Sequence, residues 1–155
     1  MNYELIESQL KELIESCPIA LSTMANAASL IYHGMENLNW AGFYVLRGNE
    51  LVLGPFIGKP ACTRIPIGKG VCGTAVKERR VQRVENVHLF PGHIACDSAS
   101  QSEIVIPLIR DDVIYGVLDI DSPVLSRFTE ADQEGLERIC DLMMASLDWA
   151  GGLLA

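Results

Sequence analysis

The stretch WAGFYVLRGNELVLGPFI, residues 40–57, decides the fold of this chain. Its two halves, residues 40–46 and 50–57, are rich in aromatic and branched apolar side chains, which favour β-strands. Between them lies Arg47-Gly48-Asn49, and glycine and asparagine readily adopt the backbone conformations of a tight turn. The stretch therefore predicts a β-hairpin with two antiparallel strands.

A second hairpin is predicted later in the chain, over residues 103–110 and 113–121, with Asp111 and Asp112 at its turn. Shorter strands are expected at residues 64–67 and 81–84, and Pro66 places the first of these at a sheet edge.

Between the short strands and the second hairpin, residues 68–80 read as a glycine turn that leads into a helix. Residues 85–102 have no apolar period and are expected to form a long surface loop. Loops of that length in compact domains are usually functional or disordered.

Helices are expected at both ends of the chain. Apolar residues recur at helical spacing over residues 3–15 and again from Pro18 to Gly34. The last helix is expected to begin at Thr129, where Asp132 completes a sequence that resembles a capping box. We predict an α+β fold with an antiparallel sheet of about five or six strands, and one domain over residues 1–155.

The composition excludes several classes of function. The net charge is −8, and basic residues do not cluster, so nucleic acid is not an expected partner. The polar start is unlike a signal peptide, and no apolar run reaches the ~18 residues that indicate a membrane span, so we expect a cytoplasmic protein. An odd number of cysteines in such a protein favours redox or metal chemistry over structural disulfides: Cys17, Cys62, Cys72, Cys96 and Cys140.

The placement of the cysteines favours redox chemistry. Cys96 lies in the predicted loop and Cys62 follows a Gly-Lys-Pro turn, so a thiolate that becomes a sulfenic acid could condense with a second, mobile thiol. Cys72 opens the short helix, whose dipole would lower the pKa of its thiol. Cys140, on the apolar face of the last helix, and Cys17, at a helix junction, are expected to be structural.

Three other chemistries fit parts of the same region. Gly68 to Gly73 matches G-x-G-x-x-G, but a dinucleotide site also needs parallel strands, which the hairpins do not supply. A better interpretation is a helix start whose free N–H groups hold an anion. A hydrolase would use one cysteine with His93 or His88 as base and leave the other cysteines unused. A zinc site is disfavoured because its candidate ligands do not form the closely spaced pairs that are usual in structural zinc sites. The four candidates are Cys62, Cys72, His93 and Cys96.

Acidic and aromatic residues in the hairpins suggest a binding pocket. Asp119 and Asp121 alternate with apolar residues and so share one face of a strand. If they face Glu103 across the hairpin, three carboxyl groups meet, and they require a cation such as ammonium or a retained proton. An EF-hand calcium loop is not expected, because its glycine and final glutamate are missing. Trp40 and Tyr44 share a face of the first strand and could line an apolar pocket near these acids, with Phe43 on the other face.

Several motifs together resemble one known family. They occur in the order NWAGFY (39–44), GKPACTRI (58–65), GVCGTA (70–75), HIACD (93–97), SEIV (102–105) and GVLDIDSP (116–123). The chain resembles the free methionine-R-sulfoxide reductases, which are stand-alone GAF domains, over roughly residues 5–147. The combination of cysteine spacing and acids is specific, whereas no single motif is.

The resemblance implies a role for each candidate residue. Cys96 takes the position of the catalytic nucleophile, Cys62 that of the main resolving cysteine and Cys72 that of a third redox cysteine. The acids of this family hold the substrate and polarise its sulfoxide, and they match Glu103, Asp119 and Asp121. The aromatic wall around the substrate's methyl group matches Trp40 and Tyr44.

The resemblance also implies the reaction and its partners. The expected substrate is free methionine-R-sulfoxide, the expected reductant is thioredoxin, and neither a cofactor nor a metal is expected. In the GAF fold the terminal helices pack on one face of the sheet. The remaining alternative is a GAF sensor that binds a small molecule without turnover. The apolar faces of the two terminal helices also suggest a homodimer.

Overall fold

The computed structural model describes residues 2–94 and 96–155, which form one sheet of six strands with four α-helices. The sheet order is β3-β2-β1-β6-β5-β4, and every pair is antiparallel. The strands are β1 (Trp40–Arg47), β2 (Glu50–Gly58), β3 (Arg64–Pro66), β4 (Gln82–Val84), β5 (Ser102–Arg110) and β6 (Val113–Ser122). The helices are α1 (Tyr3–Ser16), α2 (Ala20–Gly34), α3 (Gly70–Glu78) and α4 (Glu130–Ser146), with a 3₁₀ turn, η1 (Val87–Leu89).

Both predicted hairpins are confirmed, and the sheet joins them. β1 and β2 form the first, β5 and β6 the second, and β1 pairs with β6 between them. The two central strands therefore carry the aromatic residues and the aspartates side by side. β3 lies at the edge of the sheet, as Pro66 predicted, because proline has no N–H to donate to a neighbouring strand.

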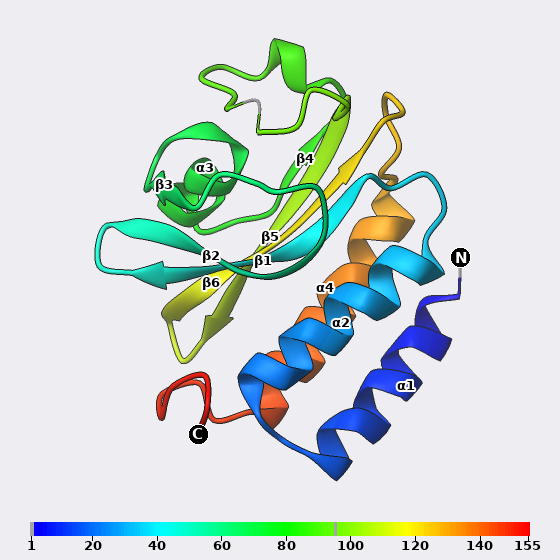
Figure 1. The fold of residues 1–155 in the computed structure, drawn as a ribbon, viewed down its shortest axis with the longest axis vertical. Helices are drawn as coiled ribbons and strands as arrows, with labels where there is room; N and C mark the ends of the chain where they lie inside the picture. The colour runs from blue at the N-terminus through cyan, green and yellow to red at the C-terminus, as the bar shows by residue number, and fades with distance from the viewer. Residues whose placement is uncertain (1, 95) are drawn as a thin grey trace.

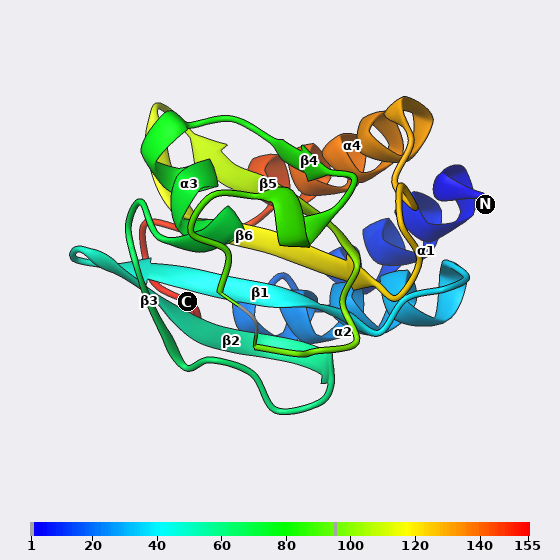
Figure 2. The ribbon, with the colours of Figure 1, turned by 90° about the horizontal axis from the view of Figure 1, so that it is seen from above.

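Helices α1, α2 and α4 lie on one face of the sheet, and α3 lies on the other (Figures 1 and 2). α2 and α4 pack directly on the strands, and α1 packs on these two helices as an outer layer. The main apolar core lies between helices and sheet and includes Leu10, Ile31, Phe43, Ile120 and Ile139, each with no exposed surface. α3 lies on the opposite face, against β3, β4, β5 and β6.

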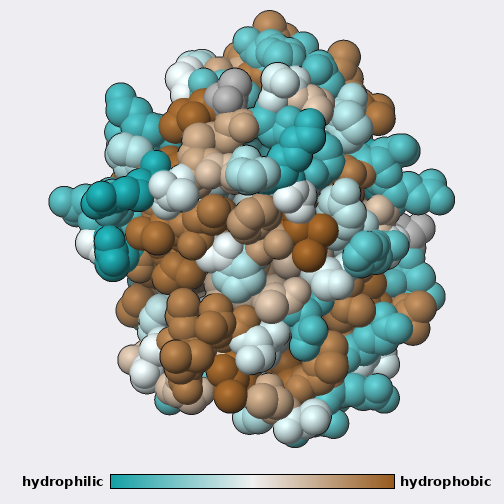
Figure 3. Space-filling view, viewed as in Figure 1, coloured by the Kyte–Doolittle hydropathy of each residue, from teal (hydrophilic) through white to brown (hydrophobic). Residues whose placement is uncertain are grey.

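The terminal helices use their apolar faces inside the molecule. Ile6 and Leu10 of α1 are buried in the main core, as is Leu136 of α4. The α1 side of the surface seen in Figure 3 mixes hydrophilic and hydrophobic residues, and Leu5 and Leu13 of this helix are exposed. Most of the apolar side chains on these two helix faces therefore pack within the chain, and a homodimer stays a prediction.

Two predictions about α4 are confirmed. Thr129 is its N-cap, and its side chain and that of Asp132 form a reciprocal capping box. Cys140 is buried in the main core, so its thiol serves as a small apolar side chain. Cys17, in contrast, is an exposed residue at the end of α1 and fills no core position.

The glycines at the start of α3 have local structural reasons. Gly68 and Gly70 adopt φ values of +87° and +62°, which side chains with a Cβ rarely adopt. A Cβ on Gly73 would lie 2.6 Å from the carbonyl oxygen of Pro66, so the helix start approaches β3 more closely than any other residue would allow. Because β3 is an antiparallel edge strand, this is not the βαβ unit that a dinucleotide site needs.

The described residues of the segment between β4 and β5 are irregular apart from η1, as the sequence predicted. Elsewhere in the described part of the chain, none of the helices combines the length and the apolar character that a membrane crossing requires.

Candidate functional site

A pocket opens on the α3 face of the sheet. The ends of β1, β5 and β6 form its floor, and the start of α3 and two loops form its walls. It gathers seven of the eight site residues predicted from the sequence: Trp40, Tyr44, Cys72, Cys96, Glu103, Asp119 and Asp121. The eighth, Cys62, is joined to Cys96 by a disulfide.

The register of the central strands brings the acids together. Glu103 of β5 lies opposite Asp121 of β6, and Trp40 of β1 lies opposite the same aspartate from the other side. Asp119 lies two residues before Asp121 and so faces the same side of the sheet. The predicted convergence of three carboxyl groups is confirmed, since they lie close enough to perturb one another's pKa.

Burial keeps protons on these acids. Glu103 and Asp119 are only 7% and 6% exposed. Burial raises the pKa of Glu103 well above its ordinary value, and the neighbouring Asp119 and Asp121 raise it further. Burial likewise raises the pKa of Asp121 and of Asp119, although hydrogen bonds with Glu103 and Cys72 favour the charged form of Asp119 and partly offset the effect of its burial. The cluster therefore favours retained protons on its carboxyl groups, and both neighbouring aspartates add to the effect of burial at Glu103, which suits this residue to donate a proton.

The aspartates still have free hydrogen-bonding capacity. The Oδ1 atoms of Asp119 and Asp121 are buried and have no hydrogen-bond partner among the described residues. Buried polar atoms usually have a partner, because a lost hydrogen bond to water is otherwise not replaced. These two atoms are therefore suited to a donor that a ligand brings into the pocket.

The disulfide between Cys62 and Cys96 links the two loops at the pocket. Cys62 lies between β2 and β3, Cys96 lies in the segment before β5, and their Cα atoms are 5.7 Å apart. The two residues are 34 positions apart in the sequence, so only the folded chain brings their sulfur atoms together. The structure thus contains the oxidised product that the redox hypothesis requires.

Trp40 and Tyr44 line the pocket and also bind the loop between β2 and β3, which carries Cys62. Trp40 and Tyr44 are stacked with ring centres 5.9 Å apart and face the pocket, while Phe43 enters the main core, as predicted. The Tyr44 hydroxyl donates to the carbonyl of Cys62 at 2.9 Å, and the Trp40 indole donates to the carbonyl of Lys59 at 3.1 Å. Burial raises the pKa of Tyr44, so its hydroxyl remains a donor.

The environment of Cys72 corrects one prediction. It lies in the first turn of α3, but its pKa is raised well above the ordinary value, not lowered. Burial is the main cause, and the nearby Asp119, Glu103 and Asp121 add to it, because a thiolate would be a further negative charge among acids. These effects outweigh the helix dipole, so Cys72 is a neutral thiol in this structure.

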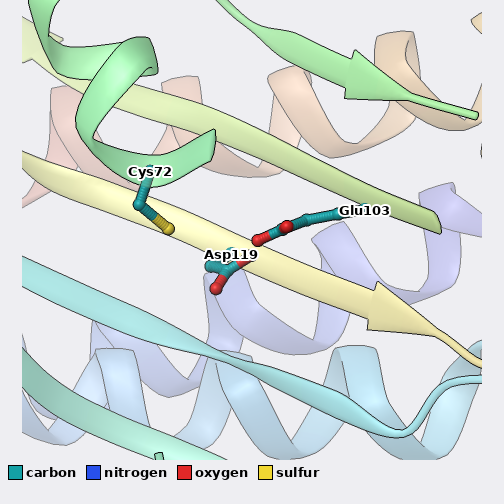
Figure 4. A group of neighbouring side chains, drawn as sticks. All are labelled: Cys72, Glu103 and Asp119. Atoms are coloured by element: carbon teal, nitrogen blue, oxygen red, sulfur yellow. The ribbon is translucent and has the colours of Figure 1, made fainter. Parts of the chain in front are cut away.

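The zinc set considered from the sequence is not assembled, because two of its thiols are joined in the disulfide. Within the described residues, a different group approaches the spacing of metal ligands: Cys72, Glu103 and Asp119 offer atoms within 4.8 Å of one another (Figure 4). Raised pKa values at Cys72 and Glu103 mean that a metal would have to displace their protons.

Two residues of the site were missed or undervalued from the sequence. Asn39, which precedes β1, donates its side-chain amide to Asp97 and to Ser100, both at 3.0 Å. It thereby attaches the Cys96 loop to the first hairpin, and Asp97 is a structural residue of that loop. His93 lines the pocket near Glu103, although the sequence suggested it only for zinc or hydrolysis.

Comparison with known proteins accounts for this arrangement. A family model described as GAF domain matches residues 11–147. The free methionine-R-sulfoxide reductase of Escherichia coli is 59% identical over 119 residues, which are 77% of this chain and 72% of that protein. The chain belongs to the free methionine-R-sulfoxide reductases of the GAF family.

Solved structures of this reductase family agree with the fold. The reduced form of fRMsr of Staphylococcus aureus is 52% identical, with a TM-score of 0.91 over 95% of this chain and 96% of that one. The complex of fRMsr of Staphylococcus aureus with substrate is 51% identical, with a TM-score of 0.89 and the same coverage. The GAF fold expected from the sequence is thus confirmed.

Proposed function

We propose that this reductase converts free methionine-R-sulfoxide to methionine, with Cys96 as nucleophile and Cys62 as resolving cysteine. The observation that carries the proposal is the Cys62–Cys96 disulfide at the pocket that Glu103 also lines, a buried acid whose pKa is raised. The family membership supplies the identity of the substrate, which the side chains alone do not define.

The chemistry needs a nucleophile and an acid at one sulfur atom. The Cys96 sulfur attacks the sulfoxide sulfur while Glu103 gives its proton to the sulfoxide oxygen, which makes the sulfur more electrophilic. The substrate sulfur is reduced by two electrons, the oxygen passes to Cys96 as a sulfenic acid, and methionine leaves. Attack by the Cys62 thiol then forms the disulfide and releases water.

A free amino acid fits the rest of the pocket. Its ammonium group supplies donors to the unpartnered oxygens of Asp119 and Asp121. Its carboxylate suits the free N–H groups at the start of α3, where Gly70 and Val71 line the pocket. Its methyl group suits the wall of Trp40 and Tyr44.

Three further expectations remain predictions. Thioredoxin is the proposed reductant, because a dithiol is needed to reopen the disulfide after each turnover. One domain over residues 1–155 is supported by helices from both ends of the chain that pack on the same sheet face. A homodimer would have to use surfaces other than the buried faces of α1 and α4.

An assay that resolves the two sulfoxide epimers tests the proposal. With dithiothreitol, and separately with thioredoxin and its reductase, we expect loss of free methionine-R-sulfoxide and retention of the S epimer. Peptide-bound methionine sulfoxide should be a poor substrate, because it lacks the ammonium group that Asp119 and Asp121 are proposed to bind. Failure to consume either free epimer would overturn the proposal.

A further inference from the structure

His93 is a pocket residue to which the proposed reaction gives no role. It lies three residues before Cys96 in the segment between η1 and β5, and both residues line the same pocket. Its Nε2 atom lies 3.9 Å from Oε1 of Glu103, the proposed acid. The histidine thus lies in the same pocket as the nucleophile and next to the proton donor.

The protonation states of the two groups suit proton transfer better than an ion pair. The His93 and Glu103 side chains are only 15% and 9% exposed. Burial lowers the pKa of His93, and the charge of His88 lowers it further, so its imidazole is neutral near neutral pH. The raised pKa of Glu103 favours its neutral form, so a neutral base lies beside a neutral acid.

The acids around the site create a need for such a base. A thiol reacts as its thiolate, but nearby carboxylates disfavour a second negative charge. At Cys72 in the same pocket, burial is the main cause of a raised pKa, and Asp119, Glu103 and Asp121 raise it further. A reduced Cys96 near these groups would accordingly be held as a thiol until a base removes its proton.

We infer that His93 takes the proton from the Cys96 thiol during attack and then returns it to Glu103. This inference rests on the proposed function. The thiol proton moves to Nε2, the proton of Glu103 moves to the sulfoxide oxygen, and transfer from the imidazolium to Glu103 restores both groups. No external proton is consumed, and His93 is neutral again before the next turnover.

In the disulfide form, the distance of 3.9 Å between Nε2 of His93 and Oε1 of Glu103 is longer than that of a hydrogen bond. Proton transfer over it needs a small shift of the loop or one bridging water, and catalytic hydrogen bonds are often longer before the substrate binds. Reduction removes the covalent link between Cys96 and Cys62, which is one of the constraints on the loop that carries His93.

Single-turnover reduction of free methionine-R-sulfoxide by pre-reduced protein tests the inference. We expect His93→Ala and His93→Gln to slow the step by about 10²-fold, the lower range for general acid–base catalysis, with little change in KM. Added imidazole should partly restore His93→Ala. His88→Ala is the matched control, because His88 is exposed on the same segment, and it should keep the wild-type rate.

A purely structural role predicts other results. His93→Gln, which keeps a polar side chain of similar shape, would then retain activity, and imidazole would restore nothing. Either result would overturn the inference, as would an unchanged rate in His93→Ala.

A second measurement needs no sulfoxide and so separates this inference from the proposed function. The reduced protein is alkylated with iodoacetamide at pH 7, and modification of the peptide that carries Cys96 is followed by mass spectrometry. We expect His93→Ala to lower the rate about tenfold relative to wild type and His88→Ala, because a base that assists thiol ionisation is lost. Equal rates would refute the role of His93 as base even if the wild-type protein reduced methionine sulfoxide normally.

Discussion

Single residues in this protein derive their chemistry from their neighbours. Glu103 and Asp119 are both buried carboxyl groups with raised pKa values, yet the two aspartates add to the effect of burial at Glu103, whereas hydrogen bonds with Glu103 and Cys72 oppose it at Asp119. Cys96 and Cys72 are both thiols at the pocket, but only Cys96 reaches a partner thiol in this structure. The roles of the two cysteines are therefore expected to separate on mutation.

The nucleophile and the resolving cysteine have different expected phenotypes. Cys96→Ser should abolish turnover, because a serine hydroxyl is a far weaker nucleophile than a thiolate. Cys62→Ser should still release one equivalent of methionine in a single turnover but fail to be recycled by thioredoxin. Quantified methionine per protein distinguishes the two, and full activity in Cys96→Ser would contradict the assignment.

The raised pKa of Glu103 links stability to pH. The folded protein keeps the Glu103 proton to a higher pH than the unfolded chain, whose glutamates titrate near 4.5. The resulting stabilisation is present below the unfolded-state pKa and is lost as the pH rises through the raised pKa. In urea denaturation, we expect the free energy of unfolding of wild type to fall, relative to Glu103→Gln, as the pH rises above about 4.5.

An identical pH dependence in the two proteins would contradict the buried, protonated state of Glu103. The same variant should lose about 10²-fold or more in kcat, since the amide cannot give a proton to the sulfoxide oxygen.

At the level of elements, β1 connects the pocket to the loop of the resolving cysteine. Trp40 and Tyr44 form one wall and also hold the main-chain carbonyls of Lys59 and Cys62. A strand in the centre of a sheet is a rigid support, so these two hydrogen bonds limit where Cys62 can move.

Tyr44→Phe tests this connection, because it removes the hydroxyl and keeps the ring. We expect a loss of about 1 kcal/mol in the free energy of unfolding, as for a typical hydrogen bond, and slower closure of the Cys62–Cys96 disulfide. KM for the substrate should change little, since the aromatic wall remains. Stopped-flow measurement of disulfide closure after a single turnover would reveal the effect, and unchanged closure would show that the hydrogen bond does not position the loop.

The start of α3 depends on a close approach to β3. A Cβ at Gly73 would collide with the Pro66 carbonyl at 2.6 Å, and backbone on both sides leaves little room to adjust. Gly73→Ala should therefore destabilise the protein by about 1–3 kcal/mol, whereas Lys77→Ala on the exposed side of the same helix should have little effect. Thermal denaturation of the two variants gives the comparison, and equal melting temperatures would contradict the close contact.

On the scale of the whole molecule, the disulfide makes stability depend on redox state. It closes a loop of 34 positions between the edge hairpin and the segment before β5. Loop closure of that length is worth about 4 kcal/mol through the entropy of the unfolded chain.

We expect the oxidised protein to unfold at a higher urea concentration than the reduced protein, by up to this free energy. Cys62→Ser should show no difference between the two conditions. A transition that dithiothreitol does not move in the wild type would contradict a disulfide in the folded protein.

Much of this architecture was predictable from local patterns. The two hairpins, the edge position of Pro66, the Thr129 capping box and the apolar role of Cys140 each depend on a few neighbouring residues and on strand or helix period. Local spacing also placed Asp119 and Asp121 on one face of β6. The sequence by itself thus determined the main elements, the fold class and seven of the residues that line the pocket.

Only the tertiary structure decided how those residues act. The joining of Cys62 to Cys96 depends on two loops 34 positions apart, and the neutral state of Cys72 depends on acids contributed by other strands. The apolar faces of the terminal helices, which suggested a dimer, turned out to be buried in the core. Which cysteines pair, which side chains are buried and which groups keep a proton all depend on distances between segments that are remote in sequence. Patterns along a chain report only local conformation.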